Sequence, residues 1–225
     1  AGTAFATPAN DLIVTAYDAQ DNVKTDYTGT IAFTSTDGAA TLPANYPFLV
    51  GDAGTKTFAG SAFTLNTTGN QTITITDAVA VISEVTGNIN VAAGALSYFT
   101  ITGAPATTYA GIAFTNPVTV TAYDAQDNIK TNYTGEIEFT SPEDALATLP
   151  ANYTFVGGDN GAKIFAGAEF ILRTTPSATI VVTDTATSIN EDTGGIIVVN
   201  PGTLGAIEIT GAPATIKAGE AFSGD

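Results

Sequence analysis

The stretch VTVTAYD at residues 118–124 alternates apolar and polar side chains, and LIVTAYD at residues 12–18 repeats it. A period of two places Val118, Val120 and Ala122 on one face of a strand and the threonines on the other. One face of such a strand packs on a core while the other meets water. These two stretches therefore predict β-structure built twice from one repeat.

The repeat extends over nearly all of the 225 residues. Alternating runs recur between clusters of Gly, Asn, Asp and Pro, and no helical periodicity of useful length appears among them. In the second copy we expect a bulge at Ala166-Gly167 and strands at residues 96–102, 118–124, 136–140, 163–172, 179–184 and 195–200. In the first copy we expect strands at residues 12–18, 30–34, 55–65, 72–77 and 87–91.

The repeat defines module 1 (residues 1–93), module 2 (residues 94–201) and a terminal stub (residues 202–225). The opening AGTAF of residues 1–5 returns as AGIAF at residues 110–114 and as AGEAF at residues 218–222. Module 1 is therefore expected to lack its first strand, and the stub to carry the first strand of a following module. The short links between units favour an extended rod of all-β sandwiches with about seven strands each.

Composition excludes several classes of function. Six Lys and Arg residues stand against 22 Asp and Glu residues, for a net charge of −16, so the chain would repel nucleic acid. No apolar run is long enough for a transmembrane segment. Absence of Cys and His removes thiolate sites and the usual general base. An acidic, Thr-rich surface fits an extracellular or cell-surface location.

Several runs resemble a known family. The residues 14–22, Tyr27-Thr28-Gly29 and Phe33-Thr34-Ser35 are similar to bacterial Ig-like modules of the invasin/intimin type, and more broadly to tandem repeats of large bacterial and archaeal surface proteins. Residues 42–46 and 73–77 fit the same pattern. One departure is Asp21-Asn22, where the family usually reads Gly-Asn. The difference matters because Asp tolerates a left-handed turn less easily than Gly. The resemblance implies tandem Ig-like sandwiches in stalks, adhesins and surface fibres.

Acidic residues recur at equivalent positions of the two modules. In an Ig-like sandwich the loops that carry them lie at one pole, and the pole of module 2 should face module 1. Ca²⁺ takes six to eight oxygen ligands, so this junction is a candidate calcium site, with affinity of roughly 0.1–1 mM. The alternative is that Asp and Asn simply form turns. The candidate ligands are Asp18, Asp21, Asn22, Asp52, Asp77 and Glu84 in module 1, and Asp124, Asp127, Asn128, Asp159, Asp184 and Glu191 in module 2.

The sequence holds no convincing catalytic constellation. Adjacent carboxylates occur at Glu143-Asp144 and Glu191-Asp192, but neighbours on a strand point to opposite faces. A glycosidase needs two carboxylates across a cleft, so we expect no enzyme. The recurring tyrosines are expected to pack over strand edges with the hydroxyl bonded to backbone, rather than to stack on sugars; they are Tyr17/Tyr123, Tyr27/Tyr133 and Tyr46/Tyr153.

The stub is the candidate assembly strand. Its apolar residues Leu204, Ile207, Ile209 and Ile216 could complete a neighbouring module 1, and burying three or four such side chains is worth about 5–10 kcal/mol. The neighbour is supplied either by a longer continuous chain, which the continuation to Gly224-Asp225 favours, or by separate subunits that donate the strand.

Both arrangements are head-to-tail contacts that do not close, so they build a filament whose partner is the chain itself. The predicted function is a structural repeat of a cell-surface stalk or extracellular filament. The alternative is an adhesin or carbohydrate-binding module with a glycan or cell-surface ligand. Near-identical copies without a large unique loop favour the structural role, since recognition normally lies on divergent loops.

Overall fold

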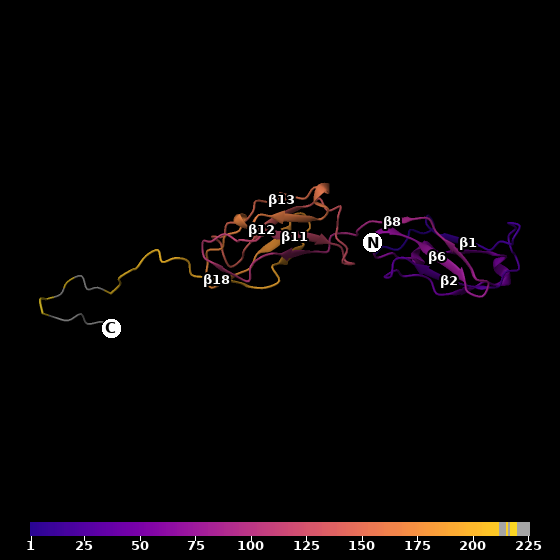
Figure 1. Cartoon of the computed structure of the whole chain (residues 1–225), viewed down its shortest axis with the longest axis horizontal. Coiled ribbons are helices and arrows are strands. Elements are labelled where there is room, and N and C mark those ends of the chain that lie inside the picture. The colour runs from indigo at the N-terminus through magenta and orange to yellow at the C-terminus, as the bar shows by residue number, and fades with distance from the viewer. Residues whose placement is uncertain (212–214, 216, 220–225) are drawn as a thin grey trace.

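The computed structural model describes residues 1–211, 215 and 217–219, and the expected all-β class is confirmed. Two groups of strands follow one another along the long axis of the molecule, and an extended segment leaves the second group (Figure 1). The strands of the first group lie in module 1 and those of the second in module 2. No helix among the residues that the structure describes is long and apolar enough to cross a membrane.

Module 1 contains eight strands in three sheets. The sheets have the strand orders β3-β2-β6-β7, β1-β4 and β5-β8, and all their pairs are antiparallel. The elements are β1 (Leu12–Thr15), β2 (Thr30–Ser35), β3 (Tyr46–Pro47), η1 (Val50–Asp52), β4 (Thr55–Phe58), η2 (Gly60–Ala62), β5 (Gly69–Gln71), β6 (Ile73–Asp77), β7 (Ile82–Val85) and β8 (Ile89–Val91).

Module 2 contains ten strands in three sheets. The sheets have the orders β13-β12-β16-β17, β14-β11-β9 and β10-β18-β15, and the β10–β18 pair is parallel. The elements are β9 (Tyr98–Thr102), β10 (Thr107–Tyr109), β11 (Val118–Tyr123), β12 (Glu136–Thr140), β13 (Tyr153–Thr154), η3 (Gly157–Asp159), β14 (Ala162–Phe165), η4 (Gly167–Glu169), β15 (Ser177–Ala178), β16 (Val181–Asp184), β17 (Asn190–Asp192) and β18 (Ile197–Asn200).

The sheets of the two modules correspond, apart from two strands. β1 and β4 match β11 and β14, but the counterpart of β9 is absent from residues 1–93. β5 and β8 match β15 and β18, but the counterpart of β10 is absent from the same residues. Two of the three sheets of module 1 therefore have one strand fewer than their counterparts in module 2.

Each module buries its own aromatic core. In module 2, Val118 and Val120 of β11 are fully buried, and β9 pairs with β11 along one edge. Their counterparts in module 1, Leu12 and Val14, remain only partly buried because no strand covers that edge of β1. The core of module 1 is therefore open on the side where module 2 has β9.

The structure corrects several expected strands. The runs at residues 55–65 and 163–172 are not single bulged strands, because the 3-10 turns η2 and η4 interrupt them. Gly167 begins η4 with its Cα facing the backbone carbonyls of Phe114 and Asn116, where a side chain would clash. The count of seven strands also misses the short edge strands β3, β7, β13 and β17, and residues 177–184 divide into β15 and β16.

Candidate functional site

The first pair of predicted site residues, Asp18 and Asp124, follows the strands β1 and β11. Asp124 is fully buried and accepts hydrogen bonds from the backbone N–H groups of Gln126 and Asn128, at 2.9 and 3.0 Å, and from that of Gly94, at 2.8 Å. Burial would raise the pKa of Asp124, but these bonds outweigh it and lower the pKa. Asp124 thereby ties its own loop to the chain that enters module 2.

Asp18 makes the same loop bonds but lacks the tie. It accepts from the backbone N–H groups of Asn22 and Gln20, both at 2.9 Å, and these bonds lower its pKa. Its carboxylate is exposed, because no incoming chain lies where Gly94 lies in module 2. The two aspartates therefore hold equivalent places in their loops, and among the described residues only Asp124 also binds the N–H of a preceding segment.

The next residue pairs stabilise their own loops. Asp52 accepts from the backbone N–H of Leu49 and the hydroxyl of Tyr46, both at 2.9 Å, and lies 3.3 Å from the Lys56 ammonium. These groups hold the pKa of Asp52 below its usual value, with the Leu49 N–H contributing most. Lys56 also lies over the Tyr46 ring, 4.7 Å from its centroid. Module 2 repeats the arrangement with Asp159, Tyr153, Val156 and Lys163.

Asp77 and Asp184 bind tyrosine hydroxyls across the sheet. The Tyr27 hydroxyl donates to Asp77 at 2.6 Å, and the Tyr133 hydroxyl donates to Asp184 at 2.5 Å. Burial, together with the bond to Asp77, raises the pKa of Tyr27 to about 12. These two tyrosines pack as expected, but the expected acceptor is wrong, because a carboxylate replaces the backbone carbonyl.

The remaining candidate ligands do not gather around these carboxylates. Glu84 and Glu191 lie on strands β7 and β17, not in a loop as expected. Asp21 and Asp127 adopt the left-handed conformation, with φ of 63° and 60°, as their place in the turn requires. Among residues 1–211 and the few described beyond them, no three acidic side chains form a group that could hold a metal ion.

Calcium at the pole stays a prediction that melting experiments can test. If calcium binds there, millimolar CaCl₂ added after EDTA treatment will raise the thermal midpoint, because a ligand that binds only the folded state stabilises it. MgCl₂ at the same concentration is the control for ionic strength. An unchanged midpoint in both salts would leave the aspartates with the turn-forming role that their backbone bonds already give them.

The adjacent carboxylates also have structural partners. Asp144 is buried and accepts from the backbone N–H groups of Arg173 and Thr174. Glu143 accepts from the backbone N–H and hydroxyl of Thr179, at 2.9 and 2.8 Å. Both members of this pair thus hold loops together. The other pair, Glu191-Asp192, lies on the edge strand β17.

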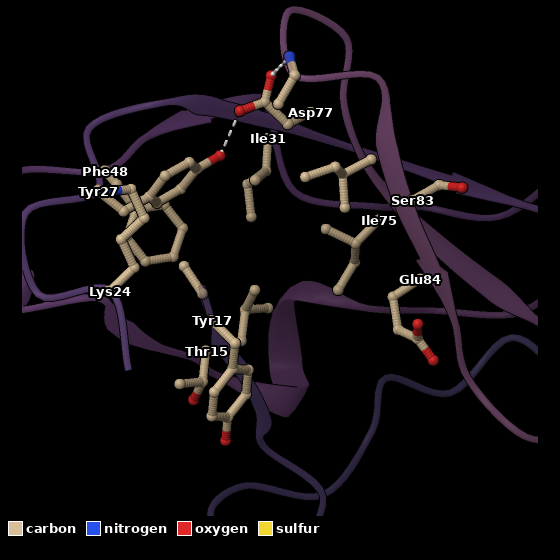
Figure 2. A pocket seen from close by; sticks show the side chains of 14 residues that line it. Thr15, Tyr17, Lys24, Tyr27, Ile31, Phe48, Ile75, Asp77, Ser83 and Glu84 are labelled. Carbon is tan, nitrogen blue, oxygen red and sulfur yellow. Dashed lines mark hydrogen bonds between the residues drawn. The ribbon is translucent and has the colours of Figure 1, made fainter. Parts of the chain in front are cut away.

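The main hollow of module 1 is an apolar seam between its sheets, where it lacks a counterpart of β9. It has a volume of about 580 Å³ and is lined by residues from β1, β2, β6 and β7. Figure 2 shows Tyr27, Phe48 and Ile75 around the space, with Asp77 at its rim bonded to Tyr27. Both sides of the seam, β1 and β7, are edge strands. We call this hollow the open seam.

Strand β9 fills the equivalent space in module 2. Its residue Phe99 is fully buried, and its ring meets the Tyr133 ring edge-on at a centroid distance of 5.6 Å. β9 pairs with β11 and lies beside β17, so it closes the gap between the two sheets. The open seam of module 1 is thus the site of a strand that module 2 possesses.

A second hollow corresponds to the other absent strand. It has a volume of about 420 Å³ and lies along β8, lined by Phe5, Leu65 and residues 89–94. In module 2 the parallel strand β10 occupies this edge of β18 and buries Thr108. The absence of two strands therefore leaves two hollows in module 1.

The stub carries the counterpart of β9 in an exposed segment, with AIEIT at residues 206–210 where β9 has YFTIT. Aligning Gly202 with Gly94 places Ile207 at Phe99 and Ile209 at Ile101. Leu204, Ile207 and Ile209 are 81, 82 and 86% exposed, although they are among the most apolar residues of the stub. Ile216, the fourth predicted assembly residue, lies outside the described residues.

Comparisons with known proteins give little. No protein-family model matches the chain, and no curated protein matches it. Among solved structures, the apo structure of Bacteroides uniformis beta-glucuronidase 3 is 16% identical with a TM-score of 0.32, over 77% of this chain and 21% of that one. The chain thus spans 21% of that structure, and so low a TM-score carries no argument about function.

A hydrogen-bonded joint, not predicted from the sequence, connects the two modules. The Asn128 amide donates to the backbone carbonyl of Asn66 at 2.7 Å and accepts from the backbone N–H of Thr68 at 3.1 Å. Lys130 donates to the carbonyl of Gly94 at 2.6 Å. The sequence predicts Asn128 only as a calcium ligand, and it does not predict the contact of Lys130 with Gly94. Their partners lie 62 and 36 residues away, and the contacted atoms belong to the backbone.

Proposed function

We propose that the chain is a structural repeat of an extracellular stalk or filament. In this proposal, Ig-like modules form an extended rod and join head to tail, and the terminal strand of one unit completes module 1 of the next. Two observations together support the proposal: the open seam lacks a counterpart of β9, and the stub, which aligns with β9, exposes its apolar side chains.

The free energy of burying apolar side chains favours binding of the stub to the open seam. Burying Leu204, Ile207 and Ile209 is worth about 5–8 kcal/mol before the hydrogen bonds of the new strand pair are counted. An edge strand left unpaired beside an apolar hollow is also prone to aggregation, which a completing strand prevents. A contact between unlike surfaces at opposite ends of a unit does not close on itself, so it propagates into a fibre.

Electron microscopy of natively isolated material, with denaturing mass spectrometry on the same sample, tests the proposal. We expect long fibres with an axial repeat close to the length of two modules. Dissociation into 22.7 kDa subunits would indicate strand donation between chains, and one very large polypeptide would indicate a continuous tandem repeat. Isolated short rods would contradict the filament.

A further inference from the structure

The β9–β11 pair provides a template for how the open seam is filled. The two strands are antiparallel, with Phe99 opposite Ala122 and Ile101 opposite Val120. Phe99 points into the core and is fully buried, and Ile101 packs against the same core. This register places alternate residues of the incoming strand inside the module.

The stub can be aligned with that template without a gap. Transferred to module 1, the register sets Ile207 opposite Ala16, Glu208 opposite Thr15 and Ile209 opposite Val14. The two isoleucines then point into the open seam and Glu208 points to solvent, because faces alternate along a strand. Ile207 is smaller than Phe99, and the lining compensates in part, since Ile75 stands where module 2 has Val182.

Polar groups at the mouth of the seam match the backbone of the incoming chain. In module 2, the Gly94 N–H donates to Asp124 and the Gly94 carbonyl accepts from Lys130. Asp18 and Lys24 occupy these positions in module 1, where Asp18 is exposed and Lys24 binds Asp26 at 2.8 Å. The counterpart of Gly94 in the stub is Gly202.

The chain leaves module 2 along the path by which it left module 1. A side chain on Gly94 would contact the backbone carbonyl of Ala1, and one on Gly202 would clash with the equivalent carbonyl of Ala110. The stub extends from the end of module 2 that faces away from module 1 (Figure 1). It therefore points away from the open seam of its own chain.

We infer that residues 202–211 of one copy of this chain bind the open seam of a second copy in the β9 register, with Gly202 held by Asp18 and Lys24. This inference rests on the proposed function and deepens it, because it fixes the occupant, the register and the polar anchor. Ala206 replaces Tyr98, so the joint between copies lacks the bond that the Tyr98 hydroxyl donates to Asp127 at 2.9 Å within the chain.

Paired cysteines test the register, since the chain has no cysteine of its own. Residues opposite each other on antiparallel strands have Cα atoms about 4.5–5.5 Å apart, within the range of a disulfide. We expect the double variant Thr15→Cys/Glu208→Cys to form a ladder of disulfide-linked oligomers under mild oxidation. The matched control is Thr15→Cys/Thr210→Cys, which would link only after a slip of two residues, and we expect at least tenfold less product.

The outcomes separate this inference from the proposed function. A ladder from the Thr15/Thr210 pair equal to or above that of the Thr15/Glu208 pair would overturn the register. Fibres seen by electron microscopy without a Thr15/Glu208 ladder would overturn the inference and leave the filament standing. Absence of assembly by the unsubstituted 225-residue chain, at concentrations up to millimolar, would overturn the inference, whereas isolated short rods in natively isolated material would overturn the filament.

The polar anchor has its own test. We expect Lys24→Ala to weaken assembly about tenfold in sedimentation velocity, since a hydrogen bond from a charged group is lost. Asp26→Ala is the matched control, because it frees Lys24 from its ion pair without removing a contact to Gly202, and assembly should be equal or stronger. Equal weakening by both variants, or none by Lys24→Ala, would remove Lys24 from the anchor.

Discussion

Replacing Phe99 with alanine is expected to destabilise module 2 by about 3–5 kcal/mol. Phe99 is fully buried, and it is the only residue of β9 in the buried class. Its loss opens a cavity against Tyr133 and re-creates in module 2 the hollow that module 1 already has. In differential scanning calorimetry, the transition assigned to module 2 should move down by more than about 10 °C.

Ile207→Ala is the matched control, because Ile207 is the counterpart of Phe99 in the stub. Ile207 is 82% exposed, so the melting of the unassembled chain should not change. The substitution should instead weaken assembly, because it removes apolar surface that the seam would bury. A destabilisation below about 1 kcal/mol for Phe99→Ala would show that β9 contributes little to closing the core.

The substitution Asp184→Ala is expected to cost module 2 about 3 kcal/mol or more. Asp184 is buried and accepts from the Tyr133 hydroxyl, from the Thr187 hydroxyl and from the backbone N–H groups of Ala186 and Thr187. Alanine would leave the buried Tyr133 hydroxyl without its acceptor. Urea unfolding followed by circular dichroism at pH 7 measures the change.

Asp184 should also contribute to acid unfolding. Burial would raise its pKa, but the bonds from Tyr133 and Thr187 outweigh burial and lower it. A lowered pKa in the folded state means that its stabilisation is complete above the unfolded-state value of about 3.9 and is lost as pH falls through the folded-state value. The urea midpoint of Asp184→Asn should therefore fall less steeply than that of the unsubstituted protein between pH 5 and 3.

Glu138→Gln is the control for both measurements, because Glu138 is exposed on β12 and its substitution removes one negative charge of the same module. It should leave the midpoint at pH 7 nearly unchanged. A pH dependence for Asp184→Asn that overlays that of Glu138→Gln would contradict a lowered pKa for Asp184.

The strands that carry alternating apolar residues were predictable from the sequence. Residues 136–140 form β12 with Ile137 and Phe139 inward, as the pattern indicates. The edge strand β17 consists of Asn190, Glu191 and Asp192, which offer no apolar alternation, so only its pairing with β16 makes it a strand. Likewise, the turn at η4 depends on the close approach of distant backbone carbonyls to Gly167, which local sequence does not reveal.

The residues of the candidate site were predictable from the sequence, but the groups that they bind were not. Repetition identified Asp18, Asp124, Asp77 and Asp184 as shared features of the modules. Whether such a carboxylate binds an ion or backbone N–H groups depends on loop geometry, and the structure gives each of them backbone donors. The apolar residues of the stub were predictable, because aligning the stub with the start of module 2 identifies them as counterparts of β9 and the residues before it.

The joint made by Asn128 has a consequence for how units can vary. Asn128 contacts the carbonyl of Asn66 and the N–H of Thr68, atoms that every residue except proline offers. The identity of the side chain at those two positions is therefore free to drift, and Arg173 already stands in the second copy where Asn66 stands in the first. In the proposed filament, units that differ in these side chains would still join through the same backbone contacts.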